Sequence, residues 1–205
     1  MTAETVMTDR RARFSRILFG LVLCLPVANP GLAQQAAPAG VAARPATDEF
    51  AARGQREARS IRYGDWQKFC FKPGGAKTVC RTTISGTFET GQIAVRVYVT
   101  EREGDSTARL QLFMPVGLYM PPGVKLTVDK GAAHKIPFTW CLTNTCIASD
   151  LAKAALLREL VGGKNLALEV IDTNLVAVTT SLPLDRFAVV SKGMPTQIFE
   201  QEIEE

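Results

Sequence analysis

The residues of this sequence best suited to chemistry are four cysteines: Cys70, Cys80, Cys141 and Cys146. Nine residues lie between the first two and four between the last two. Structural zinc sites use two short knuckles, and thioredoxin-like redox motifs keep two residues between the thiols. An even number of cysteines favours structural disulfides, for which three pairings exist. We expect Cys70–Cys80 and Cys141–Cys146, because each pair is close in the chain and flanks a turn containing Gly or Asn.

Other catalytic or metal-binding groups are sparse. The single histidine, His134, follows a Gly-Ala-Ala stretch without evident triad or metal partners, so we expect a surface polar contact. Glu101, Glu103 and Asp105 could supply an acid-base pair, but they fall in an expected hairpin loop where solvated charges are ordinary. The sequence contains no glycine-rich phosphate loop, nucleophile elbow or metalloprotease helix. We therefore expect no enzyme activity, no metal and no cofactor.

A partner-binding surface is the remaining functional candidate. Phe113, Met114, Leu118, Tyr119 and Met120 are large apolar residues that lie among prolines and a glycine. Such residues can form an exposed contact surface for a protein or cell-surface partner. The competing interpretation is core packing of two strands that are joined by a proline turn.

The N-terminal residues have the layout of a signal peptide. Four arginines between Arg10 and Arg16 precede an apolar run at residues 17–27. This run is well short of the roughly 20 residues that a membrane-spanning helix needs. Small residues at Gly31 and Ala33 predict a cut between Ala33 and Gln34. Residues 1–33 are therefore a predicted signal peptide, and we expect the mature protein in the periplasm, associated with the outer membrane, or secreted.

Two other interpretations of the leader are weaker. Cys24 could carry a lipid, but Leu23 stands before it, where a lipoprotein signal needs a small side chain. Arg10 and Arg11 could direct the twin-arginine route, but Phe14 falls one position late, so we favour the general secretory route.

Charge and hydropathy argue against a nucleic-acid partner and against a membrane span in the mature chain. Removal of residues 1–33 takes away four arginines and two acidic residues, which lowers the formal net charge from +4 to +2. No basic cluster interleaved with aromatic residues remains in the sequence, so we expect no nucleic-acid partner. No other apolar run is long enough to cross a membrane, so we expect no membrane span in the mature chain.

The mature chain divides into a leader and one domain. Residues 34–60 are rich in Ala, Arg and Pro and predict a flexible leader, whereas residues 61–205 predict a folded β domain. Alternation of apolar and polar residues indicates half-buried strands separated by turn residues, an arrangement typical of a sandwich or barrel. The expected strands cover residues 93–100, 110–114, 124–128, 136–140, 166–170 and 176–180.

One segment has helical spacing instead. Ala152, Leu156 and Leu160 are four residues apart and predict a short amphipathic helix over residues 150–160. Ser149 or Asp150 could cap its start, and a left-handed residue at Gly162-Gly163 could end it. The predicted fold class is therefore all-β: a β-sandwich of short antiparallel strands with one short helix and two disulfides.

A series of short motifs occurs in order between residues 64 and 187. They are Gly64-Asp65-Trp66, Cys70, Cys80, Met114-Pro115-Val116-Gly117-Leu118-Tyr119-Met120, Pro122-Gly123-Val124, Asp129, Gly131, Pro137-Phe138, Cys141, Cys146-Ile147-Ala148, Leu156-Leu157, Gly162 and Leu182-Pro183-Leu184. In order and spacing this stretch resembles the invasion-associated locus B family, which comprises secreted or envelope-associated proteins of alphaproteobacteria. The chain departs from the family pattern at Thr145 and at Arg186-Phe187, where a Gly and a Gly-Phe are usual.

The resemblance implies an exported β-sandwich with two disulfides, linked in some pathogens to entry into host cells, and it supplies no catalytic residues. We expect a non-enzymatic envelope or secreted protein that binds a protein or surface partner. The alternative is a periplasmic housekeeping or stress factor that assists envelope maturation.

Overall fold

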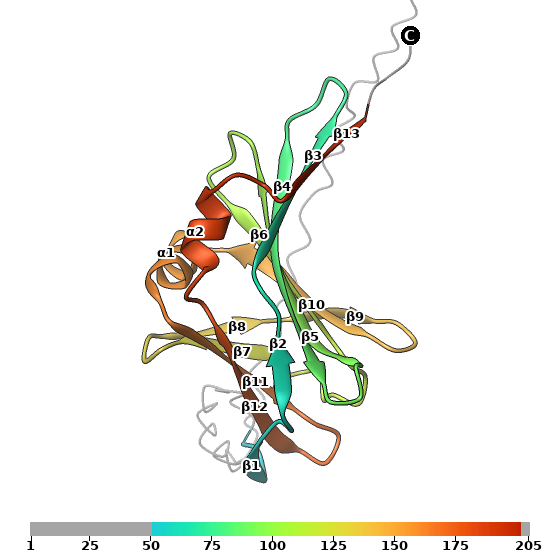
Figure 1. The fold of residues 1–205 in the computed structure, drawn as a ribbon. Helices are drawn as coiled ribbons and strands as arrows, with labels where there is room; N and C mark the ends of the chain where they lie inside the picture. The colour runs from blue at the N-terminus through green and yellow to red at the C-terminus, as the bar shows by residue number, and fades with distance from the viewer. Residues whose placement is uncertain (1–50, 202–205) are drawn as a thin grey trace, which may run out of the picture. The chain divides into compact units, whose positions relative to one another are not determined.

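Two β-sheets and two short helices make up the part of the chain that the computed structural model describes, residues 51–201 (Figure 1). The predicted all-β fold with two disulfides is confirmed. The predicted signal peptide, the cut between Ala33 and Gln34, and most of the predicted leader lie outside the described residues.

The smaller sheet has five strands in the order β1-β12-β11-β7-β8. Its pairs are antiparallel except β1 with β12, which is parallel. The strands are β1 (Gly54–Glu57), β7 (Val124–Val128), β8 (Ala133–Ile136), β11 (Asn165–Ile171) and β12 (Val176–Pro183).

The larger sheet has eight strands, seven of them in the order β13-β3-β4-β5-β6-β10-β9. The remaining strand, β2, pairs with β4, and β13 runs parallel to β3. The strands are β2 (Ile61–Tyr63), β3 (Gln67–Pro73), β4 (Val79–Phe88), β5 (Ile93–Arg102), β6 (Ala108–Met114), β9 (Phe138–Cys141), β10 (Cys146–Ala152) and β13 (Gln197–Gln201).

The core lies between the facing sides of the two sheets. Alternate residues of a strand project to the same face, and in β5 Val95, Val97 and Val99 are only 3%, 1% and 2% exposed. Leu126 of β7 and Leu168 of β11 enter the same core from the smaller sheet. The period-two patterns in the sequence therefore identify the inward faces of these strands correctly.

Both predicted disulfides are present. Cys70 and Cys80 are directly paired residues of β3 and β4. Cys141 and Cys146 close the β9–β10 hairpin. The Leu142 N–H donates to the Thr145 carbonyl across 2.7 Å, so this turn closes although Thr145 replaces the usual glycine.

The helix begins later than the sequence predicted. Residues 150–152 continue β10, because that strand pairs with β6 as far as Ala152, and α1 spans Ala154–Gly162. The cap position is Lys153, which makes no side-chain capping bond, so the predicted caps at Ser149 and Asp150 are wrong. Gly163 has an extended backbone rather than the predicted left-handed one; a Cβ there would lie 2.2 Å from Val128 Cγ1.

Several ordered elements lie outside the strands and the helix predicted from the sequence: β1, β2, β3, β4, β10, β13 and a second helix. The predicted strand over residues 136–140 is divided at Pro137, because Ile136 ends β8 of the smaller sheet and Phe138 begins β9 of the larger one. The second helix, α2 (Phe187–Lys192), lies beside α1 (Figure 1).

Strand β1 falls within the predicted leader, so the ordered domain begins before Ile61. All four β1 residues are exposed, and the strand is held in place by its pairing with β12. For this reason no local pattern of apolar residues indicated the strand.

Candidate functional site

An apolar cleft lies between the two sheets of the described domain. We call it the inter-sheet cleft; its volume is about 690 Å³. Its walls come from both sheets, so it is in effect an unfilled end of the sandwich core. The wall side chains are Ala94, Val95 and Met114 from the larger sheet, and Leu168, Val170 and Val178 from the smaller one.

One side of the cleft is formed by residues 115–118, which pass from β6 toward the smaller sheet. Leu118 forms an isolated β-bridge with Asp172. The Tyr119 N–H donates to the Ile171 carbonyl across 2.7 Å, and the Thr173 N–H to the Gly117 carbonyl across 3.2 Å. These bonds hold the segment against the β11–β12 hairpin.

The opposite boundary includes the connection from β1 to β2. The Ala58 N–H donates to the Thr179 carbonyl across 2.7 Å, which continues the pairing of β1 with β12. Tyr63 of β2 then shares a 2.7 Å hydrogen bond with the Thr180 hydroxyl of β12. Burial raises the pKa of the Tyr63 phenol above its usual range, and the bond to Thr180 opposes this in part. The Tyr63–Thr180 bond thus joins the two sheets beside the cleft.

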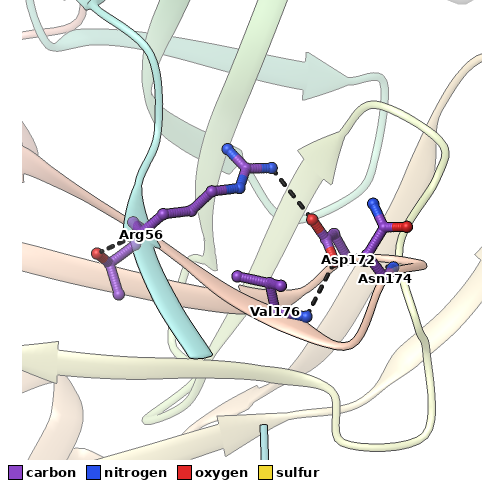
Figure 2. Close-up of polar contacts among 5 residues, drawn as sticks. Arg56, Asp172, Asn174 and Val176 are labelled. Carbon is purple, nitrogen blue, oxygen red and sulfur yellow. Dashed lines mark hydrogen bonds and ion pairs between the residues drawn. The ribbon is translucent and has the colours of Figure 1, made fainter. Parts of the chain in front are cut away.

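An ion pair stands at the polar rim of the cleft (Figure 2). Arg56 of β1 donates to Asp172 Oδ2 across 3.2 Å. The other carboxylate oxygen, Oδ1, accepts the N–H groups of Asn174 at 2.9 Å and Val176 at 3.0 Å. The Val176 bond, together with Arg56 and the Asn174 bond, lowers the pKa of Asp172.

The rim carries both signs of charge. Arg56 and Arg59 are its cations, and Glu57 and Asp172 are its anions. Since the interior walls are apolar and the rim is polar, the cleft is suited to an apolar group whose polar end remains at the opening. Asp172 is a poor general base, because three donors stabilise its ionised form.

The five predicted partner-binding residues lie in three different parts of the structure. Met114 and Leu118 line the inter-sheet cleft. Phe113 belongs to the opposite face of β6, where its ring lies 4.9 Å from that of Tyr98. Tyr119 and Met120 are 36% and 44% exposed and do not line the cleft.

The other polar candidates from the sequence make local contacts. His134 Nε2 of β8 lies 2.8 Å from Glu159 Oε2 of α1, and neither residue lines the cleft. Glu103 accepts the Thr78 N–H across 3.3 Å, and its bonds to Thr78 lower the pKa of its carboxyl. Among residues 51–201, no group of three His, Cys, Asp or Glu side chains is placed to hold a metal ion. The helices in this range are too short to span a bilayer.

The charged residues at the rim of the cleft were not predicted from the sequence. Arg56 fell within the predicted leader, and residues 173–174 were interpreted only as a turn between strands. The order Asp172-Thr173-Asn174 carried a usable signal, because an aspartate often accepts the backbone N–H two residues ahead of it. Nothing local indicated that Arg56 would pair with Asp172 across 116 residues.

Comparisons with known proteins agree on the family and fold. Residues 66–195 match the family model described as Invasion associated locus B (IalB) protein. Among solved structures, the chain is similar to invasion associated protein B from Bartonella henselae, with a TM-score of 0.56 and 22% identity. That match covers 63% of this chain and 90% of the other, and at this identity it shows the fold alone. A search of curated proteins finds no match.

Proposed function

Because this chain belongs to the invasion associated locus B family, we propose that it is an exported, non-enzymatic protein whose inter-sheet cleft receives an apolar group of a protein or cell-surface partner. The observation that carries the proposal is the cleft itself, with apolar walls and a polar rim. Its volume falls within the roughly 300–1,000 Å³ range of ligand sites in proteins.

The energetics of the walls support binding. Leu168 and Val95 are almost fully buried, whereas Val170 and Val178 are only partly covered and leave apolar surface open to the cleft. Covering such surface yields about 25 cal/mol per Å² of apolar area removed from water. The Arg56–Asp172 pair at the rim offers polar atoms that could orient the bound group.

The chemistry of the lining supports a non-enzymatic role. Among the described residues that line the cleft there is no Ser, Cys, His, Lys or Tyr. The lining hydroxyls are those of Thr179, which donates to the Arg56 carbonyl, and Thr180, which bonds to Tyr63. Glu57 has no histidine or lysine beside it among these lining residues. The one lining carboxylate with multiple hydrogen bonds, Asp172, has a lowered pKa and is occupied by three donors. This arrangement holds a ligand in place more readily than it transfers a proton or forms a covalent bond.

Export is supported by the disulfides. Two disulfides and membership of this family are consistent with an extracytoplasmic protein, because such bonds persist in oxidising compartments. We propose that residues 1–33 direct the chain out of the cytoplasm and that the mature protein acts in the periplasm, at the outer membrane or in the medium.

A cleft-filling variant tests the binding proposal. Val178→Trp places a large ring where Val178 now lines the cleft, and Thr127→Trp is the control on the outward face of the smaller sheet. A deletion strain carrying either variant is assayed for host-cell entry and for detergent sensitivity. We expect Val178→Trp to abolish entry and Thr127→Trp to preserve it, with both proteins folded and envelope integrity normal.

Three results would contradict the proposal. Normal entry with Val178→Trp, at wild-type protein levels, would show that the cleft is not used. Detergent or antibiotic sensitivity of the deletion strain without any host would support a periplasmic factor in envelope maturation. An activity on a substrate panel that vanishes in a single-residue variant would show an enzyme.

A further inference from the structure

We propose that the outward face of the eight-stranded sheet binds an acidic polysaccharide. This surface, here called the cationic aromatic face, lies on the opposite side of the sheet from the cleft walls. The proposal does not rest on the function proposed for the cleft. The face is defined by Phe71, Arg81, Arg96, Tyr98, Arg109 and Phe113.

Strand register brings these residues together. Directly paired residues project to the same side of a sheet. One row across the strands therefore contains Phe69, Arg81, Thr100, Arg109 and Leu151. The adjoining rows are Gln67, Thr83, Tyr98, Gln111 and Ser149, and Ser85, Arg96, Phe113, Ile147 and Trp140.

Rings and guanidinium groups alternate along this face. The Arg81 guanidinium lies 4.5 Å from the centre of the Tyr98 ring and 6.0 Å from that of Phe71. The Tyr98 and Phe113 rings are 4.9 Å apart, and Phe71 stacks on Phe199 at 5.1 Å. Much apolar area stays in solvent: Phe71 and Phe199 are 40% and 42% exposed, and Trp140 at the sheet edge is 63% exposed.

Hydroxyl groups, not carboxylates, position the arginines. Arg81 donates to the Thr100 hydroxyl at 3.4 Å, Arg96 to the Ser85 hydroxyl at 2.9 Å, and Arg109 to the Ser149 hydroxyl at 3.4 Å. Among the ion pairs of the described residues, none involves these three arginines.

Carboxylates are missing from the paired rows. Glu101 and Asp150 also lie on these strands. Each is adjacent in the sequence to a residue of the row that contains Arg81 and Arg109, so its side chain projects to the other face of the sheet. Asp65 lies in the β2–β3 connection, outside the paired rows, and forms no ion pair with the three arginines. The face therefore presents positive charge that no neighbouring acid of the rows neutralises.

An acidic polysaccharide fits this chemistry best. Guanidinium groups bind carboxylate, sulfate and phosphate oxygens bidentately, and exposed rings can pack on the flat faces of sugars. Arg81 and Arg109 lie in one row two strands apart, a spacing of about 10 Å, and Arg96 lies two rows along the sheet. The Arg81 and Arg96 side chains both approach Tyr98, so an extended chain that crosses the face meets positive charge in two rows. A bilayer is less suitable, because hydroxyl and amide side chains such as Thr100 and Gln111 alternate with the rings across the face.

Heparin is the probe for the test, with the exported, disulfide-bonded protein. The variant is Arg81→Gln/Arg96→Gln/Arg109→Gln, and Arg53→Gln/Arg158→Gln/Arg186→Gln removes the same charge from exposed positions elsewhere. We expect the wild-type and control proteins to bind heparin but not uncharged dextran. Loss of three ionic contacts should weaken binding by roughly tenfold or more at low salt. Arg109→Gln alone, at an exposed position, should weaken it less and serves if the triple variant unfolds.

Several outcomes would overturn the proposal. No heparin binding by the wild type at low ionic strength would do so directly. Equal weakening in the control variant would mean that only net charge matters. Stronger binding to oligo(dT) than to heparin would assign the face to single-stranded nucleic acid, and binding to anionic phosphatidylglycerol vesicles alone would assign it to a membrane surface.

Discussion

Asp172 concentrates three interactions on one carboxylate at the rim of the cleft. It bonds to Arg56 and to the N–H groups of Asn174 and Val176, and its side chain is 13% exposed. An unfolded aspartate has a pKa near about 3.9, and the fold holds the pKa of Asp172 below this value. Its contribution to stability is therefore complete above the unfolded pKa and is lost as the pH falls through the lowered one.

Replacing this carboxylate by an amide should remove that pH dependence. Asp172→Asn keeps an oxygen that can accept the backbone N–H groups, but it loses the charge that pairs with Arg56. We expect a lower Tm for Asp172→Asn at neutral pH and a difference from wild type that shrinks below about pH 4. Thermal melts between pH 7 and pH 3 measure this, with Asp185→Asn as an exposed control. A difference that is constant with pH would contradict the assignment.

Tyr63 is the residue whose hydroxyl joins the two sheets. Tyr63→Phe keeps the ring but removes the bond to Thr180, so we expect the free energy of unfolding to fall by about 1 kcal/mol. The raised pKa of the phenol favours its neutral form in the fold, so its contribution is present below about pH 10 and is lost at higher pH. Urea titrations at pH 7 and pH 10.5 test both effects; equal stability of the two proteins at pH 7 would show that the bond contributes nothing.

At the scale of elements, α2 packs on the sandwich through the Phe187 ring and Val190, and Lys68 of β3 donates to the Ser191 carbonyl at its end. Phe187 is 2% exposed and meets the Trp66 ring edge-on at 4.8 Å. The Trp66 indole in turn donates to the Pro183 carbonyl across 2.8 Å. The helix, the β2–β3 connection and the end of β12 therefore meet at a single contact.

Removing the Phe187 ring should loosen this end of the domain. We expect Phe187→Ala to cost about 3–5 kcal/mol of unfolding free energy, and to shift Trp66 emission to longer wavelength as water reaches the indole. Urea unfolding measures the first effect, and fluorescence in a Trp140→Phe background isolates the second. Val189→Ala, at a 64% exposed position of the same helix, is the control and should change stability by less than about 0.5 kcal/mol. Equal effects of the two variants would refute the packing role of Phe187.

The segment from Phe113 to Val124 shows why local composition misleads at this scale. Its apolar residues were grouped as one surface because they are neighbours in the sequence. Phe113 and Met114 end β6 on opposite faces, since successive residues of a strand alternate. Gly123, at a φ of +74°, then allows the Met120–Gly123 turn, where any Cβ would lie 2.6 Å from the Ile136 carbonyl oxygen. Apolar residues that are neighbours in this segment thus lie in the core, in the wall of the cleft and on the exposed surface.

At the scale of the whole molecule, signal-peptide removal and disulfide formation each change the mass of the protein by a measurable amount. We expect the protein recovered from cell fractions to begin at Gln34 and to weigh about 4 Da less than its reduced form, because two disulfides remove four hydrogens. Intact-mass spectrometry before and after reduction, on periplasmic, outer-membrane and medium fractions, measures processing and location together. A full-length chain in the cytoplasm with four free thiols would contradict export.

In the folded molecule, arginines that are far apart in the sequence lie on one surface. No basic cluster is visible along the chain, because Arg81, Arg96 and Arg109 are more than ten residues apart. Pairing of β4, β5 and β6 places them on one face of one sheet. A linear search therefore detects charged runs but not a charged surface built across strands.

The sequence alone predicted the β fold, the inward faces of β5, β7 and β11, and a preferred pairing of the four cysteines that the structure confirms. These follow from local physics: apolar alternation marks a half-buried strand, and cysteines close in the chain can meet across a turn. Only the tertiary structure decided that β1 pairs with β12, that residues 150–152 extend a strand, and that Arg56 meets Asp172. Those features depend on partners distant in the chain, and an isolated segment does not encode them. For the same reason, the inter-sheet cleft and the cationic aromatic face exist only in the folded domain.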